Sequence, residues 1–451
     1  MARHNGCNNP EHKISRRKLL FGAAQAGAFL AAAKRGDGQV QSNGILPRGT
    51  AKACIFITMN GAPSHVDTWD AKDGPWNPAD ANLQQYAGGV VLSKRLFPNF
   101  SQVTNDLLIV RSVNSWELAH DRGQFYHQTA HPSNPAFVAE SPHIGAVVSY
   151  ELGRRGALPP FLALNVDSQF QGAKFLGGKS EPLIAPVQAT GLTTLQHNYY
   201  GANSQARFNQ KFAMLRDLDK PLIASPYSDA MAAHATYYDS AKALMYDPAV
   251  ASVFQFSTDE SGRYGNTAFG RACIVARNAI VAKLGISFVN IVYNGWDTHA
   301  GMFDASYTPN MYTLCNDLDR GVGNLINDLK ATGDLASTLI VMIGEFGRTP
   351  GPLNAQGGRD HWKDAMSICM AGGGVRGGRA IGSTTAMGEQ ISDPGWSGNR
   401  AVFIEDIAST IYSALGIDWT KRISDTPSGR VFEYVGQAAI GNFTSVEEVF
   451  G

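Results

Sequence analysis

A short apolar run that ends abruptly in charged residues constrains the fold of this chain more than any other feature. Residues 337–343 are mostly apolar and β-branched, and Glu345 and Arg348 follow almost at once. This pattern is typical of a buried strand that delivers a carboxylate and a guanidinium to its carboxyl end. Open α/β sheets bind ligands at that edge. Asp360 and His361 follow in a glycine-flanked loop, so one segment offers the side chains of a metal or oxyanion site.

Two further apolar runs are each followed by a histidine and an aspartate two positions apart. The pairs are His65 with Asp67 after residues 53–59, and Asp297 with His299 after residues 286–293. In an extended chain this spacing places both side chains on one face, as two ligands of one ion require. A turn whose side chains cap backbone groups explains a single such pair equally well. The recurrence of the pattern favours a shared site.

The order of apolar patterns along the chain predicts the fold class. Strand-like runs alternate with helical ones. The strands are expected at 53–59, 107–113, 161–166, 286–293, 338–343 and 365–370, and helices at 142–152, 267–284, 314–329 and 404–415. This alternation predicts an α/β fold with a mostly parallel central sheet sandwiched by helices. Residues 168–265 break the pattern with loops and short helices, and we interpret them as an insertion or cap over the site.

The segment after the second predicted strand carries further polar candidates. Helical spacing places His120, Gln124 and His127 near one another. Ser112 and Ser115 lie just before this helix and offer hydroxyl groups.

The N-terminus predicts export. Paired arginines at positions 16 and 17 precede an apolar stretch at 21–33 that is rich in Ala, Leu and Gly. Residues 1–34 are therefore interpreted as a twin-arginine signal peptide, and 35–50 as a linker. A membrane anchor is the alternative, but the stretch is shorter than the ~20 residues that a bilayer needs. We expect recognition by the twin-arginine export machinery, a periplasmic or extracellular location, and no stable membrane span after cleavage.

Composition and spacing exclude several other functions. The chain has 38 basic and 38 acidic residues, so no overall field attracts nucleic acid. The cysteines after position 50 share no CxxC spacing and are expected to be buried. Residues 372–378 contain a GxGxxG pattern, but the glycine- and β-rich residues that follow do not begin the helix of a dinucleotide site.

Several motifs together carry a resemblance to one family. They lie at 61–70, at 111–112 with His120, and at 295–299, 344–350, 358–361 and 371–378. In this order they resemble the twin-arginine-exported DUF1501 proteins of the alkaline phosphatase and sulfatase superfamily. The resemblance implies an alkaline phosphatase-like domain over 51–420, with 421–451 as a C-terminal extension packed on it.

The resemblance also implies roles for particular residues. The metal ligands would be Asp67, Asp297, His299, Glu345 and His361; the catalytic residues His120 and Arg348; and the supporting residues His65, Ser112 and Asp360. Glu345 and Arg348 stand where the superfamily has a late Asp-His pair, which implies fewer metals and a guanidinium on the anion. The divalent metal would be Zn, Mn or Ca. His120, Ser112 and Ser115 all stay open as the nucleophile.

Two functions follow from these expectations. The first is an exported metal-dependent hydrolase of phosphate or sulfate esters, with a small-molecule or polymeric substrate. The alternative is a non-catalytic binding or scaffold protein of the cell envelope on the same fold. Stoichiometric metal together with ester hydrolysis would distinguish the first from the second.

Overall fold

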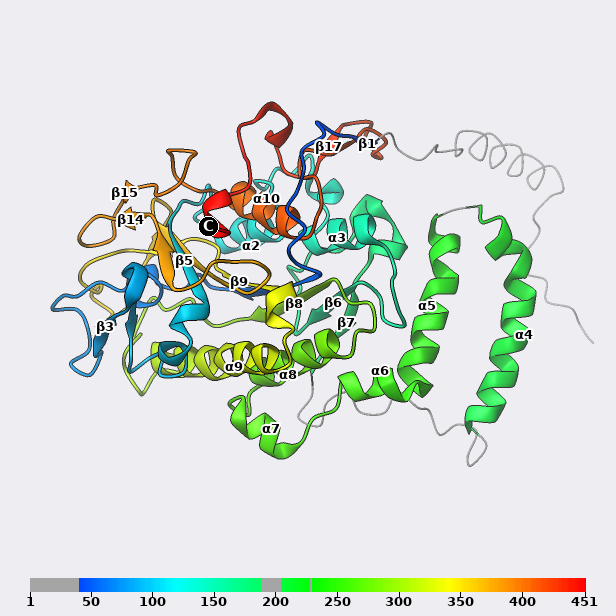
Figure 1. Cartoon of the computed structure of the whole chain (residues 1–451), viewed down its shortest axis with the longest axis horizontal. Coiled ribbons are helices and arrows are strands. Elements are labelled where there is room, and N and C mark those ends of the chain that lie inside the picture. The colour runs from blue at the N-terminus through cyan, green and yellow to red at the C-terminus, as the bar shows by residue number, and fades with distance from the viewer. Residues whose placement is uncertain (1–39, 188–203, 228) are drawn as a thin grey trace, which may run out of the picture.

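The computed structural model describes residues 40–187, 204–227 and 229–451, and its centre is an eight-stranded sheet (Figure 1). The strand order is β13-β5-β12-β9-β2-β8-β6-β7. In chain order these strands are β2 (Ala53–Met59), β5 (Leu107–Val113), β6 (Phe161–Leu164), β7 (Leu183–Ala185), β8 (Phe288–Tyr293), β9 (Thr338–Ile343), β12 (Met366–Ala371) and β13 (Arg379–Ile381). Only β12 runs antiparallel to its neighbours, so the predicted mostly parallel sheet is confirmed.

Helices cover both faces of the sheet (Figure 1). Those described are α2 (His120–Thr129), α3 (Ile144–Leu152), α4 (Ser204–Ala224), α5 (Asp229–Tyr246), α6 (Pro248–Val253), α7 (Thr258–Arg263), α8 (Ala268–Val281), α9 (Met311–Ala331) and α10 (Ile404–Ala414). Figure 1 shows α2, α3 and α10 above the sheet and α8 and α9 below it. Successive side chains of β2 point to opposite faces of the sheet. Cys54 and Phe56 pack with α3 and α10, and Ile55 and Ile57 pack with α8 and α9.

The register of the three central strands fixes where polar loops leave the sheet. β2 lies between β8 and β9 and is parallel to both. Met59 is paired with Tyr293, and Thr58 with Ile343, so the three strands end at nearly the same level. The segments that follow them therefore emerge together at one edge, where α/β sheets bind ligands.

Short strands complete the described chain outside the main sheet. β1 (Val40–Gln41), β16 (Arg422–Ile423) and β17 (Phe432–Glu433) form one sheet, and the remaining pairs are β3 (Leu83–Gln85) with β4 (Val91–Ser93), β10 (Gly347–Arg348) with β11 (His361–Trp362), and β14 (Ser383–Thr384) with β15 (Ile391–Asp393). Residues after 421 add Tyr434, Val435 and Val449 to the core on the α10 side.

The structure refines some of the predicted elements. The strand predicted at 161–166 ends at Leu164, because Asn165 takes a left-handed φ of 55°. In the predicted insertion, α5 packs on α6 and on residues Gly178–Ser180, and α4 lies beyond it (Figure 1). Residues 188–203, the predicted signal peptide and much of the predicted linker lie outside the described residues.

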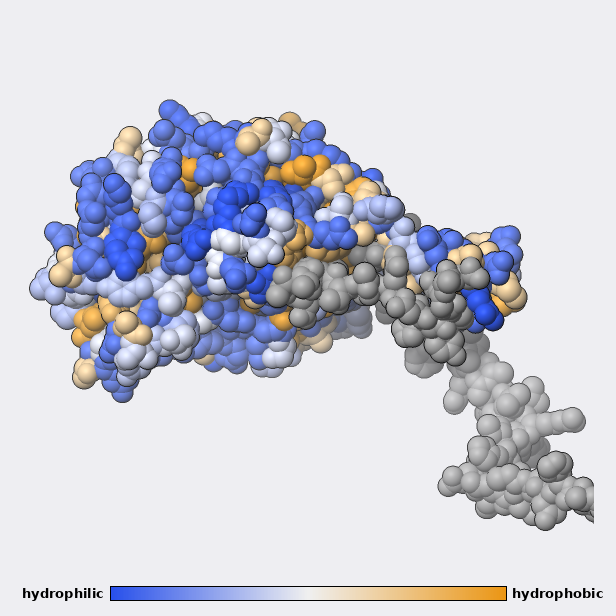
Figure 2. Space-filling model, turned by 90° about the horizontal axis from the view of Figure 1, so that it is seen from below, coloured by the Kyte–Doolittle hydropathy of each residue, from blue (hydrophilic) through white to orange (hydrophobic). Residues whose placement is uncertain are grey.

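The surface of the described chain offers no membrane span. None of its helices is both long and apolar enough to cross a bilayer. Figure 2 shows the molecule from below, and that face is mainly hydrophilic, with apolar residues in small scattered groups. The cysteines in the described chain are buried and free, as expected; they are Cys54, Cys273, Cys315 and Cys369.

Two histidines lie in the core between the sheet and its helices. His127 on α2 and His143 before α3 are at most 1% exposed. His143 accepts a hydrogen bond from the Gly145 amide and so caps α3. Burial lowers the pKa of each to about 3. His127 therefore does not join His120, although both belong to α2.

These buried histidines predict an acid-sensitive fold. Between about pH 6.5 and 3 the unfolded chain binds protons that the folded one does not, so stability falls as the pH drops through that window, by about 1.4 kcal/mol per pH unit for each histidine. Replacing His127 with Gln removes one titrating group, and the pH slope of the free energy of unfolding should become shallower. Urea unfolding between pH 5 and pH 8 measures this slope, and the difference at pH 8 gives the packing cost separately. An unchanged slope would contradict the assignment.

Candidate metal centre

Several chain segments bring polar side chains to the edge where β2, β8 and β9 end. Asp297 and His299 follow β8, and Glu345 follows β9. His361 begins β11, which pairs with β10 so that Arg348 lies opposite it. His120 is the first residue of α2.

Four of these side chains form one compact cluster. His120, Asp297, His299 and His361 each offer one ligand atom, and all four atoms lie within 4.8 Å of one another. Oδ1 of Asp297 is 3.2 Å from Nε2 of His120, 3.0 Å from Nε2 of His299 and 3.8 Å from Nε2 of His361. A tetrahedral ion with bonds of ~2.1 Å has ligand atoms about 3.4 Å apart. The spacing of the cluster therefore fits a single such ion.

The hydrogen bonds of the three histidines orient their lone pairs. Nδ1 of His120 contacts Glu345 at 2.5 Å, Nδ1 of His299 contacts Asp360 at 2.7 Å, and Nδ1 of His361 contacts the Leu118 carbonyl at 2.6 Å. Carboxylates and carbonyls only accept, so each Nδ1 carries the proton. In neutral imidazoles each Nε2 then presents a lone pair. A carboxylate or carbonyl behind each ring is the usual arrangement around a metal-bound histidine.

The charges at the centre also favour a cation. Nε2 of His299 lies 3.0 Å from Nε2 of His361, so two lone pairs face each other. Around them lie the carboxylates of Asp297, Glu345 and Asp360, and the guanidinium of Arg348 pairs with Asp297. With neutral imidazoles, two negative charges are left over. A divalent ion would balance them and accept the lone pairs.

Burial and neighbouring charges shift the pKa values of the cluster. The hydrogen bond to Glu345 raises the pKa of His120. Burial lowers the pKa of His361. Burial alone would raise the pKa of Asp297, but the hydrogen bond from Arg348 and the charges of Arg348, His120 and His299 together outweigh it, and the net shift is downward. Asp297 is therefore held as a carboxylate, with 47% of its side chain exposed to solvent.

Glu345 positions His120 from behind. Its side chain is fully buried, and its second oxygen accepts a hydrogen bond of 2.7 Å from the Gly61 amide. The start of α2 can approach because it has a glycine there: a Cβ on Gly123 would stand 2.9 Å from Cβ of Glu345. Glu345 thus acts through His120, although the sequence predicted it as a ligand itself.

Arg348 is occupied by the protein on every N–H group. Its buried guanidinium donates to the carbonyls of Gly61, Ala62 and Arg359. The remaining two N–H groups point at Oδ1 of Asp297, at 2.5 Å, and at Nε2 of His299, at 3.2 Å. In this arrangement Arg348 holds the loops and Asp297 in place. The anion-binding role predicted for it would require the His299 contact to be given up.

Asp67 lies apart from the cluster in a buried ion pair. Its carboxylate contacts Nε of Arg359 at 2.6 Å and Nη2 at 3.3 Å, and both side chains are at most 1% exposed. Arg359 also donates to the carbonyls of Thr349 and Gly351. The pair therefore joins the segment after β2 to the β10–β11 loop. Sequence reasoning missed Arg359 as a partner, although it stands inside a motif of the resemblance.

The remaining candidates have partners of their own. His65 is buried and its Nε2 contacts the Gly388 carbonyl at 2.9 Å. Ser112 donates to the Pro394 carbonyl at 2.7 Å, and Ser115 to the Glu345 carbonyl at 2.9 Å. Asp360 supports His299, as described above. Both candidate serine hydroxyls are thus engaged by backbone carbonyls.

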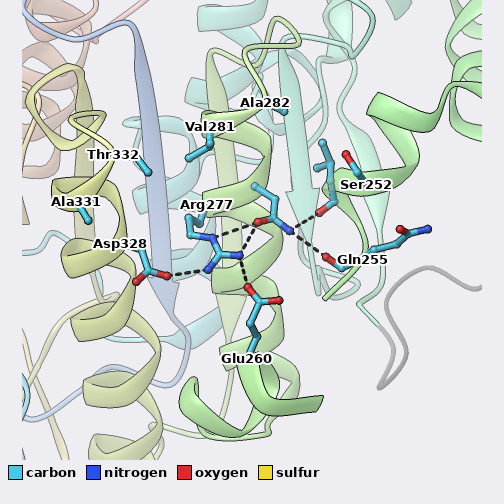
Figure 3. Close-up of a pocket in the computed structure, with 11 residues that line it drawn as sticks. Ser252, Gln255, Glu260, Arg277, Val281, Ala282, Asp328, Ala331 and Thr332 are labelled. Carbon is cyan, nitrogen blue, oxygen red and sulfur yellow. Dashed lines mark hydrogen bonds and ion pairs between the residues drawn. The ribbon is translucent and has the colours of Figure 1, made fainter. Parts of the chain in front are cut away.

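A separate depression lies between α6, α8 and α9, and its lining side chains bond to one another and link these helices (Figure 3). Arg277 stands at its centre and donates to Asp328 and Glu260, both at 2.7 Å. Asn278 beside it bonds the carbonyls of Val253 and Gln255. Arg263 also pairs with Asp328, so two arginines balance the two carboxylates, and the depression offers nothing comparable to the cluster.

The comparison with protein families identifies the chain. The model of the family described as "Protein of unknown function (DUF1501)" matches residues 51–441. The chain belongs to this family. The family assignment made from the motifs is thus confirmed, and every residue of the centre lies inside the DUF1501 match. Among curated proteins, none matches the sequence.

Several solved structures are distantly similar to this DUF1501 protein. Ps i-CgsB in complex with k-i-k-neocarrahexaose is 13% identical with a TM-score of 0.41, covering 88% of this chain and 77% of that one. The PsFucS1 sulfatase from Pseudoalteromonas sp. is 12% identical with a TM-score of 0.39, covering 93% and 74%. A protein in the alkaline phosphatase superfamily from Vibrio parahaemolyticus is 10% identical with a TM-score of 0.37, covering 90% and 76%. Likenesses this distant carry no statement about what this chain binds or transforms.

Glu345→Gln tests the support behind His120. The Gln side chain has only one accepting oxygen, so it can accept a hydrogen bond from the Gly61 amide or from His120, but not from both. Its NH2 group would then face the other donor, and His120 should lose its fixed orientation. We expect affinity for Zn²⁺ to fall about 10- to 100-fold, measured by competition with a chromophoric chelator. Asp319→Asn is the matched control, because Asp319 is a buried carboxylate that accepts from the Asn99 and Phe100 amides. Equal losses of affinity in both variants would contradict the role of Glu345.

The variant Asp67→Asn tests whether Asp67 stabilises the fold or binds the metal ion. The variant leaves Arg359 buried without its counter-charge, so the free energy of unfolding should drop by about 3–5 kcal/mol. Affinity for Zn²⁺ should stay within about twofold, because Asp67 lies outside the cluster. Chemical unfolding and the same chelator competition measure the two quantities. A loss of affinity as large as that of Asp297→Asn would show that Asp67 binds the ion.

Proposed function

We propose that this DUF1501 protein is an exported, metal-dependent hydrolase of phosphate or sulfate esters. The observation that carries the proposal is the convergence of three imidazole Nε2 atoms and one carboxylate oxygen within 4.8 Å. Each histidine is fixed from behind by a carboxylate or a carbonyl. The motif resemblance to the alkaline phosphatase and sulfatase superfamily supports the reaction class.

The donor set selects among the expected metals. Three imidazoles and one carboxylate suit Zn²⁺, and Mn²⁺ is the next choice; Ca²⁺ prefers six or more oxygen ligands, which this cluster does not offer. The four side chains are 25% to 47% exposed, so the cluster opens to solvent on one side. A bound divalent ion would polarise the ester oxygens and lower the pKa of water.

The chain's own residues would then do the following. His120, His299 and His361 hold the ion through Nε2, and Asp297 completes the set. Arg348 places a fixed positive charge beside Asp297 and holds that carboxylate in position. Because Ser112 and Ser115 both donate their hydroxyls to backbone carbonyls, water is the nucleophile that fits the arrangement best.

Export remains part of the proposal. The twin-arginine pattern at positions 16 and 17 supports it, together with the apolar stretch at 21–33. Twin-arginine export carries folded proteins, which suits a protein that acquires its metal before it leaves the cytoplasm.

Metal analysis and an ester panel together test this function. We expect about one equivalent of Zn or Mn per chain, and hydrolysis of aryl phosphate or aryl sulfate that stops when a chelator removes the ion. His299→Ala should lose metal and at least about 100-fold in kcat/KM. The control His131→Gln changes a histidine just beyond the C-terminal end of α2 and should keep both.

Two results would contradict the proposal. Metal-free protein with an intact fold would support the non-catalytic scaffold instead. Stoichiometric metal without hydrolysis of any ester would retain the metal centre but remove the reaction class.

A further inference from the structure

An exposed tryptophan stands at the rim of the metal centre. Trp116 lies in the loop between β5 and α2, with 51% of its surface exposed. The other tryptophans of the chain are buried or partly buried; they are Trp69, Trp76, Trp296, Trp362, Trp396 and Trp419. A large apolar ring left in water beside a reactive centre calls for an explanation.

The chain on both sides of Trp116 is tied to the centre. Ser115 donates to the carbonyl of Glu345 at 2.9 Å. Two residues after Trp116, the Leu118 carbonyl accepts from Nδ1 of His361 at 2.6 Å. Trp116 lies between these two anchors, so its backbone is held beside the centre.

The ring is held in one orientation. It stacks on Phe403, the residue before α10, with 4.3 Å between ring centroids and 10° between the planes. A stack of this kind covers one face of the indole and leaves the other face open. A ligand that stacks on the open face pays little side-chain entropy, because the ring is already fixed.

The neighbours of Trp116 favour an apolar contact over an ionic one. Leu118 is 40% exposed. The nearby charges of Glu117 and Arg122 are paired with each other at 2.6 Å. The free surface beside the centre is therefore a flat aromatic face with an aliphatic neighbour, a combination that suits a ring with an apolar face.

We propose that the alcohol part of the ester is a ring, either an aryl group or a pyranose sugar, which stacks on Trp116 while the ester group lies at the cluster. This inference rests on the proposed function and names its substrate class. The two ring types share one chemistry, a flat apolar face next to a charged ester. Trp116 is thus a specificity-determining residue.

Matched esters measure the effect on catalysis. Phenyl phosphate and a hexose phosphate carry a ring, and ethyl phosphate does not; the sulfate esters serve in the same way. Trp116→Ala should raise KM for the preferred ring ester about threefold to tenfold with kcat nearly unchanged, and leave ethyl phosphate unaffected. Trp116→Phe should restore most of the affinity. If only one of the two ring esters loses affinity, that ester shows whether the substrate's ring is an aryl group or a sugar. Equal effects on ring and ethyl esters would overturn the inference.

A binding measurement keeps this inference distinct from the reaction itself. Phenol and methyl glucoside, which carry no ester, are titrated into metal-free protein while tryptophan fluorescence is recorded. A saturable change with one of them in the wild type, lost in Trp116→Phe, supports ring binding even if hydrolysis fails. No saturable change with either compound overturns the proposed ring site and leaves the metal-dependent function standing.

Discussion

Everything at this centre depends on three imidazole lone pairs and one carboxylate oxygen being held face to face. Such an arrangement repels itself unless a proton or a cation lies within it. The surrounding protein fixes the geometry: Glu345, Asp360 and the Leu118 carbonyl take the Nδ1 protons, so the lone pairs cannot turn away. Arg348 supplies one positive charge at the edge of the cluster. The protein therefore maintains an arrangement that a divalent ion would complete.

The sheet makes this geometry possible. β2, β8 and β9 are parallel neighbours in close register, so segments far apart in sequence leave at one edge. Helix α2 brings His120 to the same edge, and Gly123 allows the close approach to Glu345. A register shift in any of these strands would separate the ligands and turn their side chains to the other face. The site is thus a consequence of strand pairing in the core.

The sequence predicted the parts of this site that follow directly from strands. Asp297 and His299 follow an apolar run, and runs of this kind are recognisable because burial on both faces demands them. The sequence could not separate Asp67 from Asp297, since both stand two positions from a histidine after a strand. The difference is a partner: Arg359, far along the chain, takes Asp67 into a buried pair. Tertiary contacts of this kind leave no local periodicity to recognise.

The sequence left the role of His120 open, and predicted Glu345 as a ligand, for a similar reason. A histidine at a helix start is equally compatible with a nucleophile, an acid or a ligand. Only the contact between Nδ1 of His120 and Glu345 shows that Nε2 faces the cluster and that the carboxylate stands behind it. The fold class, in contrast, followed from the alternation of strands and helices, which is a property of the local pattern.

Anomalous diffraction from crystals grown with Zn²⁺ tests the central claim most directly. The account predicts one anomalous peak at about 2.0–2.2 Å from Nε2 of His120, His299 and His361 and from a carboxylate oxygen of Asp297, with each Nδ1 contact kept. A peak at Asp67, or no peak while Arg348 still bonds His299, would contradict it.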